Sequence, residues 1–195
     1  MTLFQIILLA ATVFFAFKIY EHIQSLNDSQ ESGSEPAPRP RKKIAMFDPQ
    51  TLVEEADKAY ETGDLGKAKA LLAEADVKAP NTPEILNKLG FVLAKEGDTA
   101  RAIEHYLASL EIDAEDDMVH NAIASLYREQ NAYDKAAEHY EHAIAIDDAY
   151  EITYFNYANL LVETGETERA IEMYENALAI KPDFIQARFE QDKLR

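Results

Sequence analysis

The sequence contains no cysteine, and this absence removes several kinds of chemistry. Disulfide bonds, zinc–thiolate sites and cysteine nucleophiles are all excluded, although no cellular compartment is indicated, since proteins without cysteine occur on both sides of membranes. The 195 residues also contain no glycine-rich phosphate loop, no nucleophile elbow and no metalloprotease spacing. We therefore expect a protein that is not an enzyme, with no catalytic residues, no cofactor, no metal and no small-molecule substrate.

Basic residues are scarce in the main part of the chain. Residues 49–182 contain 11 Lys or Arg against 28 Asp or Glu, and the segments on either side are balanced, so this part carries the whole net charge of −17. Such an acidic surface repels phosphate backbones, so we expect no nucleic-acid partner. It favours solubility, and it could also attract basic partners.

A long apolar run occurs only near the N-terminus. Residues 3–17 are apolar at all but two positions, and this character continues to Tyr20. Eighteen residues of helix span about 27 Å, slightly less than the ~30 Å hydrocarbon layer. The run therefore predicts a transmembrane anchor over residues 1–20. A cleaved signal peptide is the alternative, but it would need a basic start and a small-residue cleavage site, and both are missing.

The segment that follows predicts a tether and an orientation. Residues 21–48 are rich in Ser, Pro and acidic residues, which indicates a disordered linker. It contains the basic cluster Arg39, Arg41, Lys42 and Lys43, whereas no Lys or Arg precedes the apolar run. The positive-inside bias then places the bulk of the chain in the cytoplasm, at a bacterial inner membrane. The opposite topology, with a periplasmic repeat domain, stays open as the alternative.

From residue 49 the chain repeats itself four times with a step of 34 residues. Small residues, large residues and helix breakers each keep this step. The small residues are Ala68, Ala102, Ala136 and Ala170, with Ala56, Gly90, Ala124 and Ala158, and Ala75, Ser109, Ala143 and Ala177. The large residues are Leu72, Tyr106, Tyr140 and Tyr174, and the breakers are Gly63, Gly97, Asn131 and Gly165.

These residue types predict a pair of packed helices in each copy. Apolar residues recur at helical spacing in two stretches, for instance 151–163 and 167–180, with Gly165 between them. Glycine or asparagine there can take the left-handed conformation that ends a helix. Small residues let the two helices approach closely, and the large residue fills the remaining space. One pair cannot cover its own apolar face, so stacked neighbours must do it.

The 34-residue period, the small–aromatic–small run of Ala136, Tyr140 and Ala143, and the prolines Pro80 and Pro182 resemble the tetratricopeptide repeat. The resemblance implies an all-α solenoid of four helix-turn-helix repeats within residues 49–182. Their bounds are 49–82, 83–116, 117–150 and 151–184. Residues 183–195 are predicted to form a helix that caps the last repeat, with Phe184, Ile185, Ala187 and Phe189 on one side.

Members of this family line a concave groove with the first helix of each pair. The resemblance therefore implies a partner-binding groove formed by Asp57, Asn87, Phe91, Asn121, Ser125, Arg128, Phe155, Asn156 and Asn159. Asparagine offers both a donor and an acceptor, so a row of asparagines can bind the backbone of an extended peptide. Hydrogen bonding between helices is the equally weighted alternative.

Some family members hold a C-terminal carboxylate with a basic clamp on this surface. The matching positions here are Val53, Asp57, Asn87 and Ile152 instead of lysines, which disfavours capture of an acidic tail.

Histidines provide the one weak signal for a metal. His139 and His142 lie three residues apart on a predicted second helix, a spacing that can present two ligands. Surface histidines are the favoured interpretation. His120 occupies a position where other copies have Leu52, Leu86 and Tyr154, so we expect it to be buried and paired.

Together these patterns predict a membrane-anchored scaffold that binds protein or peptide partners. Membrane-anchored bacterial repeat proteins of this plan act in envelope biogenesis, and the resemblance extends to that role as an expectation. A periplasmic chaperone-like assembly factor is the alternative.

Overall fold

The computed structural model describes residues 48–195, and the predicted anchor (1–20) and nearly all of the predicted linker (21–48) lie outside them. Within residues 48–195 all regular structure is helical, in nine helices, and there is no strand. None of these helices is both long enough and apolar enough to cross a membrane. They are α3 (Pro49–Glu61), α4 (Leu65–Lys78), α5 (Pro83–Lys95), α6 (Thr99–Leu110), α7 (Asp117–Glu129), α8 (Tyr133–Ile146), α9 (Glu151–Thr164), α10 (Thr167–Ile180) and α11 (Ile185–Asp192).

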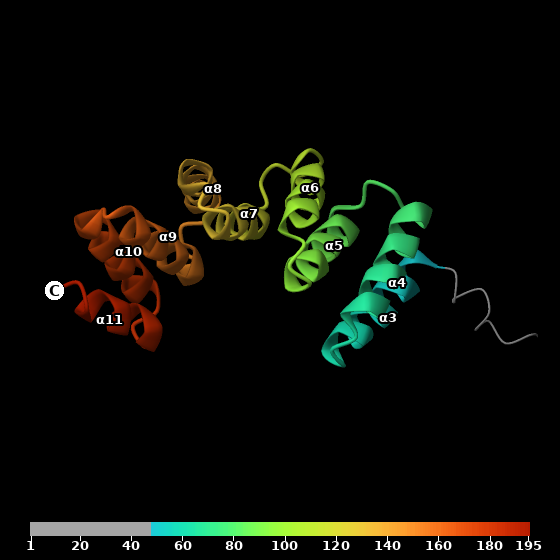
Figure 1. The fold of residues 1–195 in the computed structure, drawn as a ribbon, viewed down its shortest axis with the longest axis horizontal. Coiled ribbons are helices and arrows are strands. Elements are labelled where there is room, and N and C mark those ends of the chain that lie inside the picture. Colours follow the sequence, from blue (N-terminus) through green and yellow to red (C-terminus); the bar gives the residue numbers. More distant parts are fainter. Residues whose placement is uncertain (1–47) are drawn as a thin grey trace, which may run out of the picture. The chain divides into compact units, whose positions relative to one another are not determined.

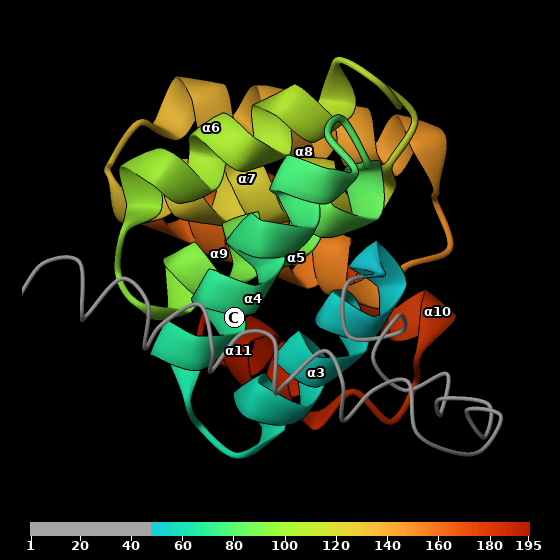
Figure 2. The same cartoon turned by 90° about the vertical axis from the view of Figure 1, so that its right-hand side faces the viewer.

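Consecutive helices pack as pairs, and the pairs follow one another in chain order (Figures 1 and 2). The pairs are α3 with α4, α5 with α6, α7 with α8, and α9 with α10. The second helix of each pair contacts the first helix of the next, and α11 packs against α10. The predicted all-α arrangement is therefore confirmed for the described residues.

Local signals in the sequence begin and end these helices. Asp64, Asp98 and Asp116 each accept a hydrogen bond from a backbone N–H three residues later, which caps the first turns of α4, α6 and α7. Asn131 and Gly165 have φ angles of 58° and 83°, so both take the left-handed conformation that the repeat pattern predicts. The chain can then reverse between the two helices of a pair.

The core forms where small residues of one helix face large residues of its partner. The alanines that define the repeat are completely buried, and two of the large residues, Tyr140 and Tyr174, are at most 1% exposed. Removing this apolar surface from water provides the main stabilisation, at about 25 cal/mol per Å². The fully buried alanines are Ala68, Ala102, Ala136 and Ala170.

The second pair has a glycine where the other pairs have an alanine, and a tyrosine ring lies against it. A Cβ added to Gly90 would lie 2.9 Å from Cε1 of the Tyr106 ring, whereas the equivalent positions in the other pairs hold alanine. Tyr106 is 5% exposed, so its ring has little room to move. A Cβ at this position would therefore require the ring to shift, whereas Ala124 and Tyr140 occupy the same two positions together in the third pair.

The terminal helix α11 corrects one prediction. Phe184, Ala187 and Gln191 are buried against the last pair, but Ile185 is 78% exposed and Phe189 is 60% exposed. The four apolar residues therefore do not share one side. Residues 184, 187 and 191 follow the helical spacing of one face, and residues 185 and 189 lie one turn apart on another face.

Enlarging a core alanine tests this packing. We expect Ala136→Leu to lower the free energy of unfolding by about 1–3 kcal/mol, because a completely buried site has no space for the added atoms. The measurement is urea denaturation followed by circular dichroism. Ala145→Leu on the exposed face of the same helix is the control, and equal midpoints for the two variants would contradict the packing described.

Candidate functional site

A groove lies between the first two pairs and contains three of the predicted binding residues, Asp57, Asn87 and Phe91. We call it the α3–α5 groove. Its cavity has a volume of about 250 Å³. It is lined by Ala56, Asp57, Tyr60, Leu72, Asn87, Lys88, Phe91 and Val92, which come from α3, α4 and α5.

The lining of the α3–α5 groove is largely apolar, and its charges are paired. Tyr60 and Phe91 contact each other with ring centroids 5.2 Å apart, and Phe91 remains 42% exposed. Lys88 Nζ lies 2.7 Å from Asp57 Oδ1, which neutralises both charges at the groove. Lys95 Nζ lies 5.3 Å from the centre of the Phe91 ring. The groove is therefore suited to an apolar side chain rather than to a free charge.

Asn87 leaves one unsatisfied acceptor in this lining. Its Nδ2 donates to Asp116 Oδ2 at 3.1 Å, and a carboxylate can only accept, so this bond fixes the orientation of the amide. The opposite atom, Oδ1, is buried and has no hydrogen-bond partner among the protein atoms. A buried acceptor without a donor costs about 1–3 kcal/mol, so a ligand N–H that reached it would be favoured.

The other predicted asparagines bond within the protein. Asn156 Nδ2 donates to Asn121 Oδ1 at 3.2 Å, which joins the first helices α7 and α9 of adjacent pairs. The Tyr174 hydroxyl donates to Asn159 Oδ1 at 2.6 Å, within the last pair. Of the two alternatives left open by the sequence, this geometry corresponds to hydrogen bonding between helices.

The three remaining predicted residues also have partners in the protein. The Ser125 hydroxyl donates to the Asn121 carbonyl at 3.0 Å and lies 3.1 Å from the Tyr140 hydroxyl. Arg128 forms an ion pair with Glu163 at 3.6 Å. Phe155 contacts the Phe184 ring at a centroid distance of 5.0 Å. Of two cavities within residues 48–195, the α3–α5 groove is lined by three of the nine predicted residues, and the other cavity is lined by none of them.

The sequence spacing suggested His139 and His142 as a pair of metal ligands, but in the structure the close contact of His139 is with His120. His120 Nδ1 lies 3.0 Å from His139 Nδ1, so His120 is paired as expected, but both residues are half-buried and His120 is not fully buried as predicted. The His142 ring lies 5.3 Å from the His120 ring. Within residues 48–195 no group of three or more His, Asp or Glu residues is arranged to hold a metal ion.

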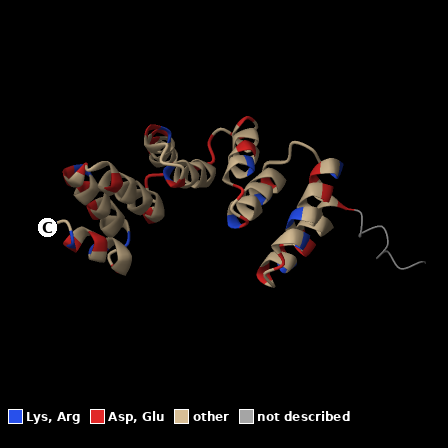
Figure 3. Ribbon diagram, in the orientation of Figure 1, with Lys and Arg blue, Asp and Glu red and all other residues tan. Residues whose placement is uncertain are grey.

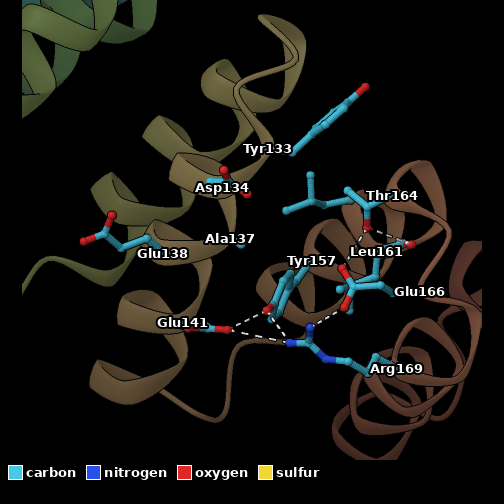
Figure 4. A pocket seen from close by; sticks show the side chains of 11 residues that line it. Tyr133, Asp134, Ala137, Glu138, Glu141, Tyr157, Leu161, Thr164, Glu166 and Arg169 are labelled. Atoms are coloured by element: carbon cyan, nitrogen blue, oxygen red, sulfur yellow. Dashed lines mark hydrogen bonds and ion pairs between the residues drawn. The ribbon is translucent and has the colours of Figure 1, made fainter.

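A second cavity, of about 310 Å³, lies between the last two pairs, and we call it the α8–α10 pocket (Figure 4). The Tyr157 hydroxyl donates to Glu141 Oε1 at 2.7 Å and accepts from Arg169 at 2.8 Å. Burial and the bond to Glu141 raise the pKa of Tyr157 to about 12, so the phenol stays protonated. Arg169 also pairs with Glu166, so the chain's own arginine occupies the acidic side of this pocket.

Sequence reasoning missed Tyr60 and Lys88 of the groove and the whole α8–α10 pocket. Tyr60 has no counterpart at the repeat step, so periodicity could not select it. A signal existed for Tyr157, which stands where the preceding copies have Leu89 and Ile123. A hydroxyl at such a buried position indicates a polar partner nearby.

Comparisons with known proteins agree with this architecture. Two family models described as tetratricopeptide repeat match residues 81–149 and 127–190. The chain belongs to the tetratricopeptide repeat family. This confirms the family predicted from the sequence, whose members are generally protein-interaction scaffolds and not enzymes. No curated protein sequence matches the chain.

Several solved structures of tetratricopeptide proteins are similar to this one. A crystal structure of MamA is 27% identical with a TM-score of 0.67, and the match covers 71% of this chain and 81% of that one. YrrB, described as having an unusual peptide-binding site, is 17% identical with a TM-score of 0.67, covering 74% of each chain. The first such domain of Spaghetti, bound to an HSP90 peptide, is 22% identical with a TM-score of 0.56, covering 57% and 89%.

The bond between Asn121 and Asn156 can be tested by a double-mutant cycle. We expect each single change to alanine to lower the free energy of unfolding by about 1 kcal/mol, because the partner amide loses its bond. The loss of unfolding free energy in the double variant should be smaller than the sum of the losses in the two single variants, and the difference is the coupling energy between the two side chains. Urea denaturation of the unaltered chain, the two single variants and the double variant gives the four free energies of unfolding. A coupling energy of zero would show that the two side chains do not stabilise the helix array.

Proposed function

We propose that the protein is a membrane-anchored scaffold that binds extended segments of partner proteins in the α3–α5 groove. The observation that carries this proposal is Asn87 Oδ1, a buried acceptor without a donor, on a residue that lines the same cavity as the partly exposed Phe91. We propose that a peptide places an apolar side chain against Tyr60 and Phe91, and that a small movement of the Asn87 side chain lets Oδ1 accept a backbone N–H of the peptide. Such a contact satisfies a polar group and buries apolar surface at the same time.

The comparisons support protein binding in general terms. YrrB is described as having a peptide-binding site, and the Spaghetti domain is bound to a peptide, so the same fold presents peptide sites elsewhere. Val53 and Ile152, at two positions of the basic clamp used for acidic tails, are respectively buried and half-buried. We therefore propose an apolar anchor as the feature recognised at the groove.

The charge of the repeats favours a partner with basic flanks. Acidic residues lie on every helix pair (Figure 3), and residues 49–182 carry 28 of them against 11 basic residues. An acidic surface raises the rate at which basic segments arrive, and salt weakens this attraction. The proposed ligand thus combines an apolar residue with neighbouring Lys or Arg, and its binding should weaken as ionic strength rises.

Photo-crosslinking tests the groove. With p-benzoylphenylalanine replacing Phe91, we expect partner adducts in membranes of cells that express the chain, and fewer or none with the same residue at Val77 on α4. Asn87→Ala in the Phe91-substituted chain should reduce the adduct yield about tenfold, because a ligand hydrogen bond is lost. Asn176→Ala, a half-buried asparagine outside the groove, is the matched control. Equal yields in both alanine variants would contradict the proposal.

We propose that residues 1–20 anchor the chain in a bacterial inner membrane with the repeats in the cytoplasm, where they organise partners in envelope or membrane-complex assembly. The support comes from the apolar run and from the basic cluster Arg39, Arg41, Lys42 and Lys43 that follows it. The alternative is a periplasmic chaperone-like role.

A topology reporter separates these two locations. Alkaline phosphatase is active only after export, so we expect a fusion after Arg195 to show low activity and a fluorescent-protein fusion at the same place to be bright. Replacing the basic cluster with glutamine should raise phosphatase activity, because the orienting charge is lost. High phosphatase activity in the unaltered chain would exclude the cytoplasmic location and favour the periplasmic alternative.

A further inference from the structure

Two histidines face each other between the helices of the third pair. His120 on α7 and His139 on α8 bring their Nδ1 atoms to 3.0 Å, which is hydrogen-bond distance. A neutral imidazole has one N–H donor and one acceptor nitrogen. The contact is therefore possible only when at least one of the two Nδ1 atoms carries no proton.

Either ring can supply the donor, because both tautomers of a neutral imidazole place one N–H on the ring. Whichever Nδ1 donates, the other Nδ1 carries no proton and accepts.

Burial keeps both rings neutral at pH 7. Desolvation is the main cause that lowers the pKa of His120, and it lowers the pKa of His139 to about 4, with the facing ring as a second cause. Asp116 and Asp117 on α7 and Glu138 on α8 oppose this effect, while His142 adds to it. The Tyr127 ring of α7 also contacts the His139 ring, with centroids 5.7 Å apart.

We propose that the His120–His139 pair is a pH-sensitive switch that loosens the packing of α7 against α8 when both rings are protonated. A first proton can be held without loss of the hydrogen bond, since one acceptor nitrogen remains. A second proton leaves two N–H donors and two positive charges facing each other. Both rings then move apart, and the helices that carry them lose their contact.

The two histidines lie in the third helix pair, which connects the first two helix pairs to the last. Ile123 of α7 packs in the same apolar cluster as Leu93 of α5, and Tyr140 of α8 packs with Tyr157 of α9. Each helix pair is held only by its neighbours in such an array. Loosening the third pair therefore uncouples the first two pairs, which contain the α3–α5 groove, from the last pair.

The sign of the pH effect follows from the lowered pKa values. The folded state binds fewer protons than the unfolded state, in which histidine has a pKa of about 6.5. The stabilising contribution is complete above that value and is lost as the pH falls from about 6.5 towards the folded-state pKa of His139, about 4. Acidification of the unaltered protein should therefore weaken the third pair selectively.

Equilibrium unfolding in urea tests the proposal, with the full chain in detergent micelles at pH 7 and pH 5. Because the His139 ring is half-exposed, we expect its protonation to raise the unfolding constant of the unaltered chain about tenfold relative to His139→Asn over this interval. His105→Asn is the matched control, since His105 occupies the same position one repeat earlier. It should behave as the unaltered chain does. Parallel pH dependence of the unaltered chain and His139→Asn would overturn the switch.

A measurement on the unaltered chain keeps the test valid even if a variant folds poorly. Hydrogen exchange, corrected for the intrinsic effect of pH, should show faster exchange in α7 and α8 at pH 5, with less change in α3 and α4. Histidine ring resonances should show two midpoints clearly below 6.5. Uniform exchange along the array, or midpoints at 6.5 or above for His120 and His139, would overturn the proposal.

Discussion

Helix pairs in this protein depend on the distance at which their backbones meet, and small side chains set that distance. Where Ala136 and its repeat equivalents lie completely buried, the partner helix comes close enough for one large residue, such as Tyr140, to fill the interface. Each pair then exposes an apolar face that only another pair can cover. The order of the array, the position of both cavities and the meeting of His120 with His139 all follow from this repeated approach.

Polar groups also distinguish the pairs from one another. Asp116 shows how one side chain can serve two neighbouring pairs: one carboxylate oxygen caps α7, and the other accepts from Asn87 on α5. That second bond orients the Asn87 amide and leaves its oxygen facing no donor. The feature on which the proposed binding depends is therefore produced by the junction between two repeats, and neither repeat contains it alone.

The sequence predicted the helices well because the physical constraints repeat. A completely buried alanine and a left-handed Asn131 or Gly165 leave the same trace in every copy, so four copies reinforce one another. The residues of the candidate site do not recur at the same position in every repeat. Asn121 and Asn156 look equally suited to a ligand and to each other, and only their 3.2 Å separation decides. The prediction for α11 was wrong because it assigned the apolar residues Ile185 and Phe189 to the buried side. In a helix these two residues lie on a different face from Phe184, and both are exposed.

The contact between Gly90 and Tyr106 limits how freely the repeats could exchange during evolution. Four copies with one period suggest interchangeable modules, yet the second pair has lost the Cβ that its equivalents keep, and a ring now occupies that space. The third pair nevertheless combines Ala124 with Tyr140 at the same two positions, so the limit comes from the placement of the Tyr106 ring and not from the residue types. A module exchanged as a whole helix pair keeps its own ring placement, whereas an α5 that carried alanine would require the Tyr106 ring to shift.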